Sequence, residues 1–216
     1  MRLACTIYHP GGDTPLPALI ALHGFGSHAL DLLGLAPELA GGRLLVICPQ
    51  APHRLPDFYG FSWSGADPGA PGAPGRLDAA AEAVRALIDD AITRFAIDPG
   101  RLALLGFSQG GMLAAPLALR DPERYAGLAL LSTTIVGARS AELTATAAAA
   151  RLPVLVQHGA RDEAIPVAQA HASVERLRQL GLAPEYEEYP MAHEVSRTST
   201  TALTRWLERV LRLDPR

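Results

Sequence analysis

Residues 102–112 read LALLGFSQGGM: an apolar run, a serine between glycines, and the start of a second apolar pattern. The run from Leu102 to Leu105 is typical of a buried strand, and the leucine spacing after Met112 is typical of a helix. Glycines on both sides of Ser108 leave room for a backbone that folds back sharply. The stretch therefore predicts a strand, a nucleophile elbow and a helix, with the Ser108 hydroxyl raised above a sheet edge. An ordinary tight turn is the alternative.

Strand-like runs alternate with helix-like patterns on both sides of this stretch. Several of the runs are continuously apolar, as in the strands of parallel sheets that are covered on both faces. We therefore expect an α/β fold with a mostly parallel central sheet, helices on both faces and a single domain over residues 1–216. The expected strands are residues 3–8, 18–22, 44–48, 102–105, 128–131, 154–157 and 185–189, and the expected helices are residues 29–39, 84–95, 112–119, 167–180 and 203–211.

The composition is that of a soluble globular protein, because 49% of the 216 residues are hydrophobic, 19% are charged and the net charge is −3. This balance predicts no nucleic-acid partner. No apolar run reaches transmembrane length, so we expect no stable membrane insertion and a cytoplasmic location. Cys5 and Cys48 lie in separate apolar runs without metal-ligand spacing. They are expected to be buried free thiols, and no metal site is predicted.

Three polar residues follow predicted strands in the chain order Ser108, Asp162, His193. The carboxyl ends of parallel strands meet at one edge of a sheet, where ligands bind. A serine is a poor nucleophile at its own pKa and needs a base. The imidazole of His193 is expected to take the serine proton and later give it to the leaving group, while the Asp162 carboxylate orients that imidazole. The three residues therefore predict a catalytic triad in the order of α/β-hydrolases.

Each triad partner also has a simpler interpretation. Asp162 could cap the helix after it, and His193 could be a turn histidine with a satisfied hydrogen bond. His23 and His158 each precede a glycine at a strand end, and both are expected to brace their turns rather than act as the base. Three further histidines have no motif that supports them as the base: His28, His53 and His171.

Stabilisation of a tetrahedral oxyanion requires two backbone N–H groups near the nucleophile. One is expected from Gln109, which follows the serine, and the second from the loop after an earlier strand. Residues 23–26 read HGFG after such a strand, so Phe25 is predicted to supply the second N–H. A plain glycine-rich hairpin is the alternative.

The segments around these residues resemble those of the phospholipase/carboxylesterase family, to which the acyl-protein thioesterases belong. The most specific segments are GFSQGG at residues 106–111 and HGARDEAIP at residues 158–166. Together with LHGFG at 22–26, PQAP at 49–52 and MAHE at 191–194, they cover nearly the whole chain. The resemblance implies a compact α/β-hydrolase fold without a cap domain. It also implies an esterase of small and medium acyl groups or lysophospholipids, without a cofactor and sometimes homodimeric.

The resemblance implies the same triad and the same two oxyanion amides. The sequence departs from the family pattern at Phe25, Ser27 and Ala192, and the first two border the expected acyl site. These departures bear on the substrate rather than on the mechanism. Trp63, in the aromatic loop between Asp57 and Gly75, resembles a family tryptophan that walls the cleft; a hydrophobic cluster beneath that loop is the alternative. Ile165 is expected either to line the acyl pocket or to pack the start of a helix.

The sequence therefore predicts a serine carboxylesterase that hydrolyses short- to medium-chain esters through an acyl-enzyme, with a small-molecule ester as its partner. An acyl-thioesterase or a lysophospholipase on the same triad is a second interpretation, and a non-catalytic binding module is a third. The segment from Thr133 to Leu152 has too few large apolar residues for a lid with a buried underside. We therefore expect an open cleft.

Overall fold

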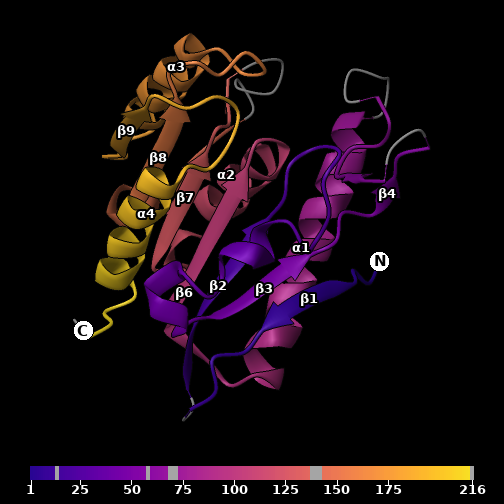
Figure 1. Cartoon of the computed structure of the whole chain (residues 1–216), viewed down its shortest axis with the longest axis vertical. Helices are drawn as coiled ribbons and strands as arrows, with labels where there is room; N and C mark the ends of the chain where they lie inside the picture. Colours follow the sequence, from indigo (N-terminus) through magenta and orange to yellow (C-terminus); the bar gives the residue numbers. More distant parts are fainter. Residues whose placement is uncertain (13–14, 57–58, 68–72, 137–142, 215–216) are drawn as a thin grey trace.

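The computed structural model describes residues 1–12, 15–56, 59–67, 73–136 and 143–214. Its centre is a seven-stranded sheet with the order β1-β3-β2-β6-β7-β8-β9 (Figure 1). All neighbouring strands are parallel except β1, which runs antiparallel to β3. The strands are β1 (Cys5–Tyr8), β2 (Leu16–Leu22), β3 (Leu45–Pro49), β6 (Ile97–Phe107), β7 (Gly127–Leu131), β8 (Val154–Gly159) and β9 (Glu185–Tyr189). The predicted α/β fold with a mostly parallel sheet is confirmed.

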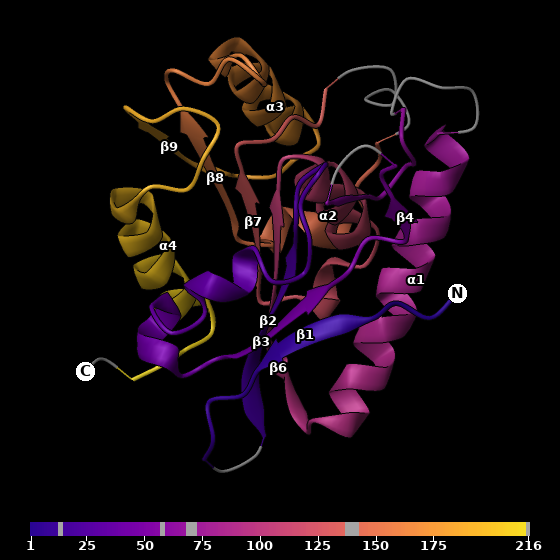
Figure 2. The ribbon, with the colours of Figure 1, turned by 45° about the vertical axis from the view of Figure 1, so that its right-hand side comes forward.

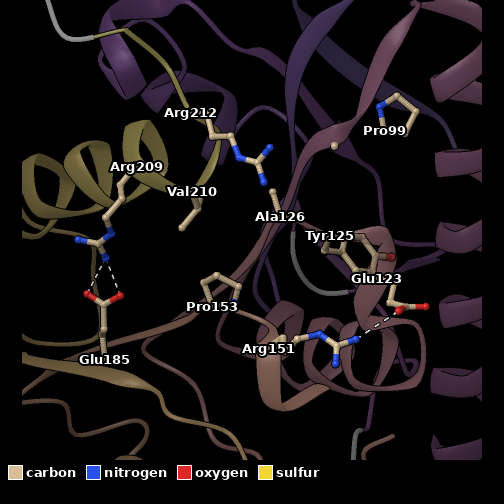
Figure 3. Close-up of a pocket in the computed structure, with 11 residues that line it drawn as sticks. Pro99, Glu123, Tyr125, Ala126, Arg151, Pro153, Glu185, Arg209, Val210 and Arg212 are labelled. Atoms are coloured by element: carbon tan, nitrogen blue, oxygen red, sulfur yellow. Dashed lines mark hydrogen bonds and ion pairs between the residues drawn. The ribbon is translucent and has the colours of Figure 1, made fainter. Parts of the chain in front are cut away.

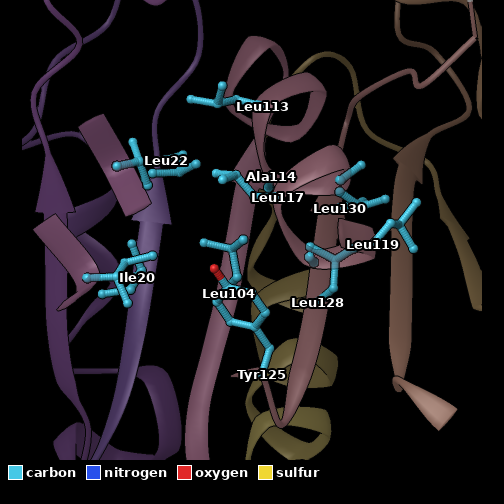
Figure 4. Close-up of a cluster of buried hydrophobic side chains, with 14 of the residues drawn as sticks. Ile20, Leu22, Leu104, Leu113, Ala114, Leu117, Leu119, Tyr125, Leu128 and Leu130 are labelled. Atoms are coloured by element: carbon cyan, nitrogen blue, oxygen red, sulfur yellow. The ribbon is translucent and has the colours of Figure 1, made fainter. Parts of the chain in front are cut away.

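Helices cover both faces of this sheet, and α1 and α4 lie on opposite sides of it (Figure 2). Alternate strand residues point to opposite faces. Ile20 and Leu104 therefore join the core beneath α1, α2 and α3, whereas Leu19 and Ala103 join the core beneath α4. Figure 4 shows leucines of α2 facing apolar side chains of β2, β6 and β7. The helices are α1 (Ala73–Arg94), α2 (Gln109–Arg120), α3 (Val167–Gln179) and α4 (Arg197–Val210).

The strand order reverses direction next to β6. The chain runs from β2 outward to β3, and after β6 it runs the other way through β7, β8 and β9. In open α/β sheets the crevice for ligands lies at such a switch point, outside the carboxyl ends of the strands. The loop after β2 and the turn after β6 therefore meet where a ligand site is expected.

The expected helix over residues 29–39 is wrong. Two short 3₁₀ turns, Leu32–Leu35 and Leu39–Gly42, stand in its place. Pro37 cannot donate a helical hydrogen bond, and Gly34 weakens the segment further. The apolar residues still do what their spacing indicates, because Leu32 and Leu39 are buried against the sheet face that α4 covers.

Two other sequence expectations need revision. Cys48 is a buried free thiol as expected, but Cys5 is free and exposed, since its strand is an edge of the sheet. The aromatic segment from residue 54 to 75 is not without regular structure: β4 (His53–Arg54) pairs with β5 (Phe61–Ser62), and α1 begins at Ala73. Residues 57, 58 and 68–72 of that segment lie outside the described residues. Within the described ranges, none of the helices combines the length and apolarity needed to span a bilayer.

Candidate active site

The turn between β6 and α2 holds Ser108 in a backbone conformation that L-residues rarely adopt, with φ 52° and ψ −119°. Two glycines make this turn possible. A Cβ on Gly110 would lie 2.0 Å from the carbonyl oxygen of Leu22, and a Cβ on Gly106 would lie 2.4 Å from the carbonyl oxygen of Gly110. The backbone conformation of Ser108 costs on the order of 1–3 kcal/mol and persists only where the surrounding structure enforces it. The local geometry is therefore that of the predicted elbow.

Residues at the end of β7 fix the elbow from the side. The Ser108 N–H donates to the carbonyl of Leu131 at 3.0 Å, and Thr133 Oγ1 donates to the carbonyl of Ser108 at 2.6 Å. Ser132 has a φ of 43°, and its Oγ donates to the carbonyl of Glu194 at 3.3 Å. Sequence patterns alone assign no role to these two residues. The available signal was that they are polar and directly follow a buried strand.

The side chains of Asp162 and His193 form a hydrogen-bonded pair. His193 Nδ1 lies 2.8 Å from Asp162 Oδ2, and the other carboxylate oxygen accepts the backbone N–H groups of Ala164 and Ile165 at 2.9 and 2.8 Å. A carboxylate only accepts, so Nδ1 carries the proton and the lone pair lies on Nε2. The Asp162 side chain is fully buried, whereas that of His193 is 26% exposed. The imidazole thus has its basic nitrogen directed away from the carboxylate.

The three predicted triad residues gather at the carboxyl edge of the sheet, because Ser108 follows β6, Asp162 follows β8 and His193 lies in the turn after β9. The ring of His193 also packs against Phe107, the residue before the serine, with 5.0 Å between ring centroids. The alternative interpretation of Asp162 as a helix cap is wrong, because the N-cap of α3 is Pro166 and no side chain caps that helix; the carboxylate instead accepts N–H groups in the turn before α3. The imidazole pair and the turn use different oxygens of the same carboxylate.

The loop after β2 lies directly against the serine. A Cβ on Gly24 would be 3.3 Å from Ser108 Cβ, so the backbone that leads to Phe25 runs past Ser108. The Phe25 side chain is 41% exposed, whereas Gln109 is buried at the start of α2. The residues predicted to donate the two oxyanion hydrogen bonds therefore come from the loop after β2 and from the start of α2, which meet at Ser108.

His23 is a buried structural histidine, as expected from its position. Its Nε2 accepts the N–H of Ala51 at 3.1 Å, and its Nδ1 lies 2.8 Å from the carbonyl of Gly24. Because the Ala51 N–H can only donate, the neutral ring carries its proton on Nδ1. Burial lowers the pKa of this imidazole, because the charged form is poorly solvated there.

His158 braces the turn that carries Asp162. Its Nε2 donates to the carbonyl of Ile165 at 2.8 Å and lies 3.4 Å from Asp162 Oδ2. The ring is fully buried, and among the described residues its Nδ1 has no hydrogen-bond partner. A buried N–H without an acceptor is costly, so the proton belongs on Nε2. This geometry matches the expected supporting role.

Trp63 does not wall the cleft. Its side chain is fully buried in the core beneath the aromatic loop, and it packs on the ring of His23 with 5.2 Å between centroids. The resemblance is misleading here, because the indole turns inward to donate Nε1–H to the carbonyl of His23 at 2.8 Å. Ile165 is 7% exposed and leads into α3. Its contact with a substrate stays a prediction.

A groove of about 590 Å³ lies at the opposite edge of the sheet, far from the triad (Figure 3). Its walls come from the amino ends of β6, β7, β8 and β9 and from the end of α4. Two of its arginines are paired, Arg209 with Glu185 and Arg151 with Glu123. Within the described ranges, no three His, Cys, Asp or Glu side chains are grouped to hold a metal ion.

Comparison with known sequences identifies one family along almost the whole chain. Residues 5–211 match the family described as Phospholipase/Carboxylesterase. A probable inactive carboxylesterase of Oryza sativa subsp. japonica is 30% identical over 133 residues, which cover 61% of this chain and 54% of that protein. The chain spans about half the length of the curated relatives it matches.

Solved structures show the same fold. A carboxylesterase from Mesorhizobium loti superposes with a TM-score of 0.79 at 23% identity, covering 95% of this chain and 94% of the other. Acyl-protein thioesterase 2 of Zea mays superposes with a TM-score of 0.76 at 23% identity, covering 96% and 99%. At this level of identity the superpositions establish the α/β-hydrolase fold and leave the substrate open.

Proposed function

Because the chain belongs to the phospholipase/carboxylesterase family, we propose that it is a serine hydrolase that cleaves carboxylic esters through an acyl-enzyme on Ser108. The family membership confirms the resemblance found in the sequence. The observation that carries the proposal is the 2.8 Å contact between His193 Nδ1 and Asp162 Oδ2, with the His193 ring packed on Phe107, the residue before a serine in a strained turn. A histidine held in this tautomer can accept a proton at Nε2 and no other ring atom.

The acylation step follows from this arrangement. Ser108 Oγ attacks the ester carbonyl carbon while its proton passes to His193 Nε2. The carbonyl π electrons move to oxygen, and the N–H groups of Phe25 and Gln109 stabilise the oxyanion. When the tetrahedral intermediate collapses, the bond to the alcohol oxygen breaks and the alcohol leaves with the proton from Nε2. The acyl group is then an ester of Ser108.

Deacylation repeats the sequence with water as the nucleophile. Water gives a proton to His193 Nε2 and forms a bond to the acyl carbon, and Ser108 recovers the proton as the acid leaves. In both steps the imidazole passes through its charged form, which the buried Asp162 carboxylate stabilises. The backbone N–H groups of Ala164 and Ile165 donate to the other carboxylate oxygen, so the Asp162 side chain keeps its position while the imidazole gains and loses its proton.

Thioesters and lysophospholipids are the second candidate substrates, since the same steps cleave an acyl–sulfur or a glycerol ester bond. The superposition on a maize acyl-protein thioesterase favours their inclusion. A binding role without catalysis is the third candidate, since one relative is described as probably inactive. The intact Ser108, Asp162 and His193 argue against that role for this chain.

A fluorophosphonate probe tests the proposal, because it forms a covalent bond with a serine only when a base and an oxyanion site activate that serine. We expect one equivalent to react, and mass spectrometry of the digest to locate it on Ser108. Ser108→Ala should abolish labelling and lower kcat on p-nitrophenyl esters by roughly 10⁴- to 10⁶-fold.

Ser132→Ala is the control for indirect effects, since it lies beside the elbow without being the nucleophile. It should keep both labelling and measurable turnover. A folded Ser108→Ala protein that retains more than about a tenth of wild-type turnover would sink the assignment. Comparison of kcat/KM across p-nitrophenyl esters, acyl-thioesters and lysophospholipids separates the three candidate substrate classes.

A further inference from the structure

The two amides proposed to bind the oxyanion belong to segments far apart in the sequence, and both must keep their positions as charge develops. A preorganised hole requires donors that do not reorient during the reaction. Phe25 lies in the loop after β2, and Gln109 begins α2. Buried residues that contact both segments would hold the two N–H groups in fixed positions.

Trp63 makes one hydrogen bond to each of these two segments. Its backbone N–H donates to Oε1 of Gln109 at 3.0 Å, and its indole Nε1–H donates to the carbonyl of His23 at 2.8 Å. The amide of Gln109 is oriented without ambiguity, because a backbone N–H must face the oxygen, and Nε2 then donates to Ser64 Oγ at 2.9 Å. Trp63 is fully buried, so both bonds are shielded from water.

His23 carries the same constraint forward to Phe25. The Nδ1–H of its neutral ring donates to the carbonyl of Gly24 at 2.8 Å. In a planar trans peptide the C=O of one residue and the N–H of the next point in opposite directions. Fixing the Gly24 carbonyl therefore fixes the direction of the Phe25 N–H. The indole of Trp63 in turn fixes the preceding carbonyl, that of His23 itself, and packs on its ring.

The far side of the loop is fixed by β5. The N–H of Gly26 donates to the carbonyl of Phe61 at 3.0 Å, and the N–H of Phe61 donates to the carbonyl of Ser27 at 2.8 Å. Phe61 stands two residues before Trp63 in the same segment. One short segment, residues 61–64, thus contacts the loop after β2 through Phe61 and Trp63 and the Gln109 side chain through Ser62, Trp63 and Ser64.

We propose that Trp63 is a positioning residue of the oxyanion hole, which joins the loop after β2 to the start of α2 and so sets the separation of the Phe25 and Gln109 N–H groups. The proposal rests on the proposed function, since it assumes that these amides act in ester cleavage. It assigns Trp63 no contact with the substrate. It also accounts for an indole at a site where bulk alone would be supplied by phenylalanine.

Trp63→Phe removes the Nε1–H and keeps an aromatic ring. The chain offers a matched control in Trp206, which is 2% exposed and donates Nε1–H to Glu185 from α4, on the opposite face of the sheet. Trp206→Phe removes the same kind of group from a second buried indole, in the core on the other face of the sheet. A second variant replaces the indole of Trp63 by benzothiophene, which preserves the ring shape and deletes only the N–H. This variant covers the case in which phenylalanine fails to fold.

A displaced oxyanion donor should lower kcat with little change in KM. Loss of one oxyanion donor costs about 10²- to 10³-fold in kcat. The Trp63 variants remove only the indole bond to the loop that carries Phe25, so they displace that donor without deleting it, and we expect a fall of roughly 10- to 100-fold. The inhibition constant of a trifluoromethyl ketone, which forms an oxyanion on the serine, should rise in parallel with the loss in kcat/KM. The apparent pKa in the pH–rate profile should not move, because His193 and Asp162 are untouched.

Other outcomes overturn the inference. Equal kinetics for Trp63→Phe and Trp206→Phe, or a benzothiophene variant with wild-type kcat, would show that the indole N–H has no such role. A rise in KM at constant kcat would instead make Trp63 a substrate contact. In each of these cases the wild-type protein still reacts with the fluorophosphonate, so the proposed function stands. A wild-type protein that neither reacts nor hydrolyses esters would refute the proposed function and this inference together.

Discussion

His23 and His193 carry their proton on the same ring nitrogen but differ in whether the other ring nitrogen can accept a proton. In His23 and in His193 the proton lies on Nδ1, where the Gly24 carbonyl accepts it in the first ring and the Asp162 carboxylate in the second. The difference lies at Nε2. In His23 that nitrogen already accepts the N–H of Ala51, so it cannot take a proton from serine. In His193, Nε2 is free of the carboxylate and the side chain is partly exposed.

The stability of the protein should depend on the neutral state of His23. Burial lowers the pKa of His23 in the folded state below its ordinary value of 6.5. As the pH falls below 6.5, the unfolded chain takes up a proton there that the folded chain does not bind. The contribution of His23 to the free energy of unfolding therefore decreases as the pH falls below 6.5, by up to about 1.4 kcal/mol per pH unit. Above that pH the contribution is complete.

Urea unfolding of wild type and His23→Asn between pH 5 and 8 measures this contribution. Asparagine keeps a donor for the Gly24 carbonyl but does not titrate, so the variant should lose part of the acid sensitivity. A pH dependence identical to that of wild type would mean that His23 takes no part. Equal changes in both proteins from the other histidines cancel in the comparison.

The triad candidates could be predicted from the sequence because each is tied to a local pattern. Ser108 stands between glycines after an apolar run, and Asp162 and His193 each follow a predicted strand. Trp63 could not be interpreted correctly, because its partners, His23 and Gln109, are distant in sequence and only the folded chain brings them together. A tryptophan in a loop rich in Pro, Gly and aromatics gives the same pattern whether its indole points inward or outward.

At the scale of elements, the elbow depends on the close approach of α2 to the end of β2. A Cβ on Gly110 would lie 2.0 Å from the carbonyl oxygen of Leu22, in backbone that cannot move without breaking the pairing of β2 with β6. Gly110→Ala should therefore lower the free energy of unfolding by about 3 kcal/mol or more. It should also misplace the serine and reduce fluorophosphonate labelling.

Gly75→Ala is the matched control for this substitution. Gly75 lies near the start of α1, and a Cβ there meets no atom within 4 Å. The change should stabilise the protein by about 0.4–1 kcal/mol by restricting the unfolded chain. If Gly110→Ala proves as stable as Gly75→Ala in urea unfolding, the elbow is not as tight as described.

The elements themselves were predictable where burial and pattern agree. The expected strand at residues 128–131 is a continuous apolar run, and the one at residues 154–157 is apolar up to Gln157; the observed strands differ from them only at their ends. The helix expected over residues 29–39 is wrong because Pro37 and Gly34 oppose the α-helix that the apolar spacing alone indicates. Burial of its leucines against the sheet requires only that they point the same way, which short 3₁₀ turns achieve as well as an α-helix.

At the scale of the whole molecule, the topology brings the site together. The strand order reverses at β2 and β6, so the loop after β2 and the turn after β6 are neighbours at the carboxyl edge. The turns after β8 and β9 add Asp162 and His193 from the same edge. The fold class followed from the alternation of patterns, but the neighbouring positions of β2 and β6 are a property of strand order, which no local pattern encodes.

The connection between β7 and β8 should govern how substrates reach the site. In the described part of this connection, residues 132–136 and 143–153, the only helical element is the 3₁₀ turn Ala147–Arg151, which lies just before β8. No helix in those residues covers the carboxyl edge where Ser108 stands. We therefore expect a cleft that substrates enter from solution, bordered by the exposed side chain of Phe25.

A cleft without a lid predicts a particular dependence on acyl chain length. Each methylene that finds apolar wall contributes about 0.8 kcal/mol, or roughly a fourfold rise in kcat/KM. The rise should end within the medium-chain range, because a methylene beyond the wall remains in water and gains nothing. Initial rates on p-nitrophenyl esters of increasing length, all kept below their solubility limits, measure both the slope and the point at which it ends.

The same open cleft predicts no jump in rate at an interface. Enzymes with a lid gain activity when an emulsion displaces the lid, whereas here we expect the Ser108 edge to be accessible to dissolved ester. The rate on tributyrin should follow one saturation curve through the solubility limit, with Ser108→Ala as the blank. Weak activity on dissolved ester followed by a sharp rise on emulsified long-chain triglyceride would require a covering element, and would contradict the open cleft inferred from the β7–β8 connection.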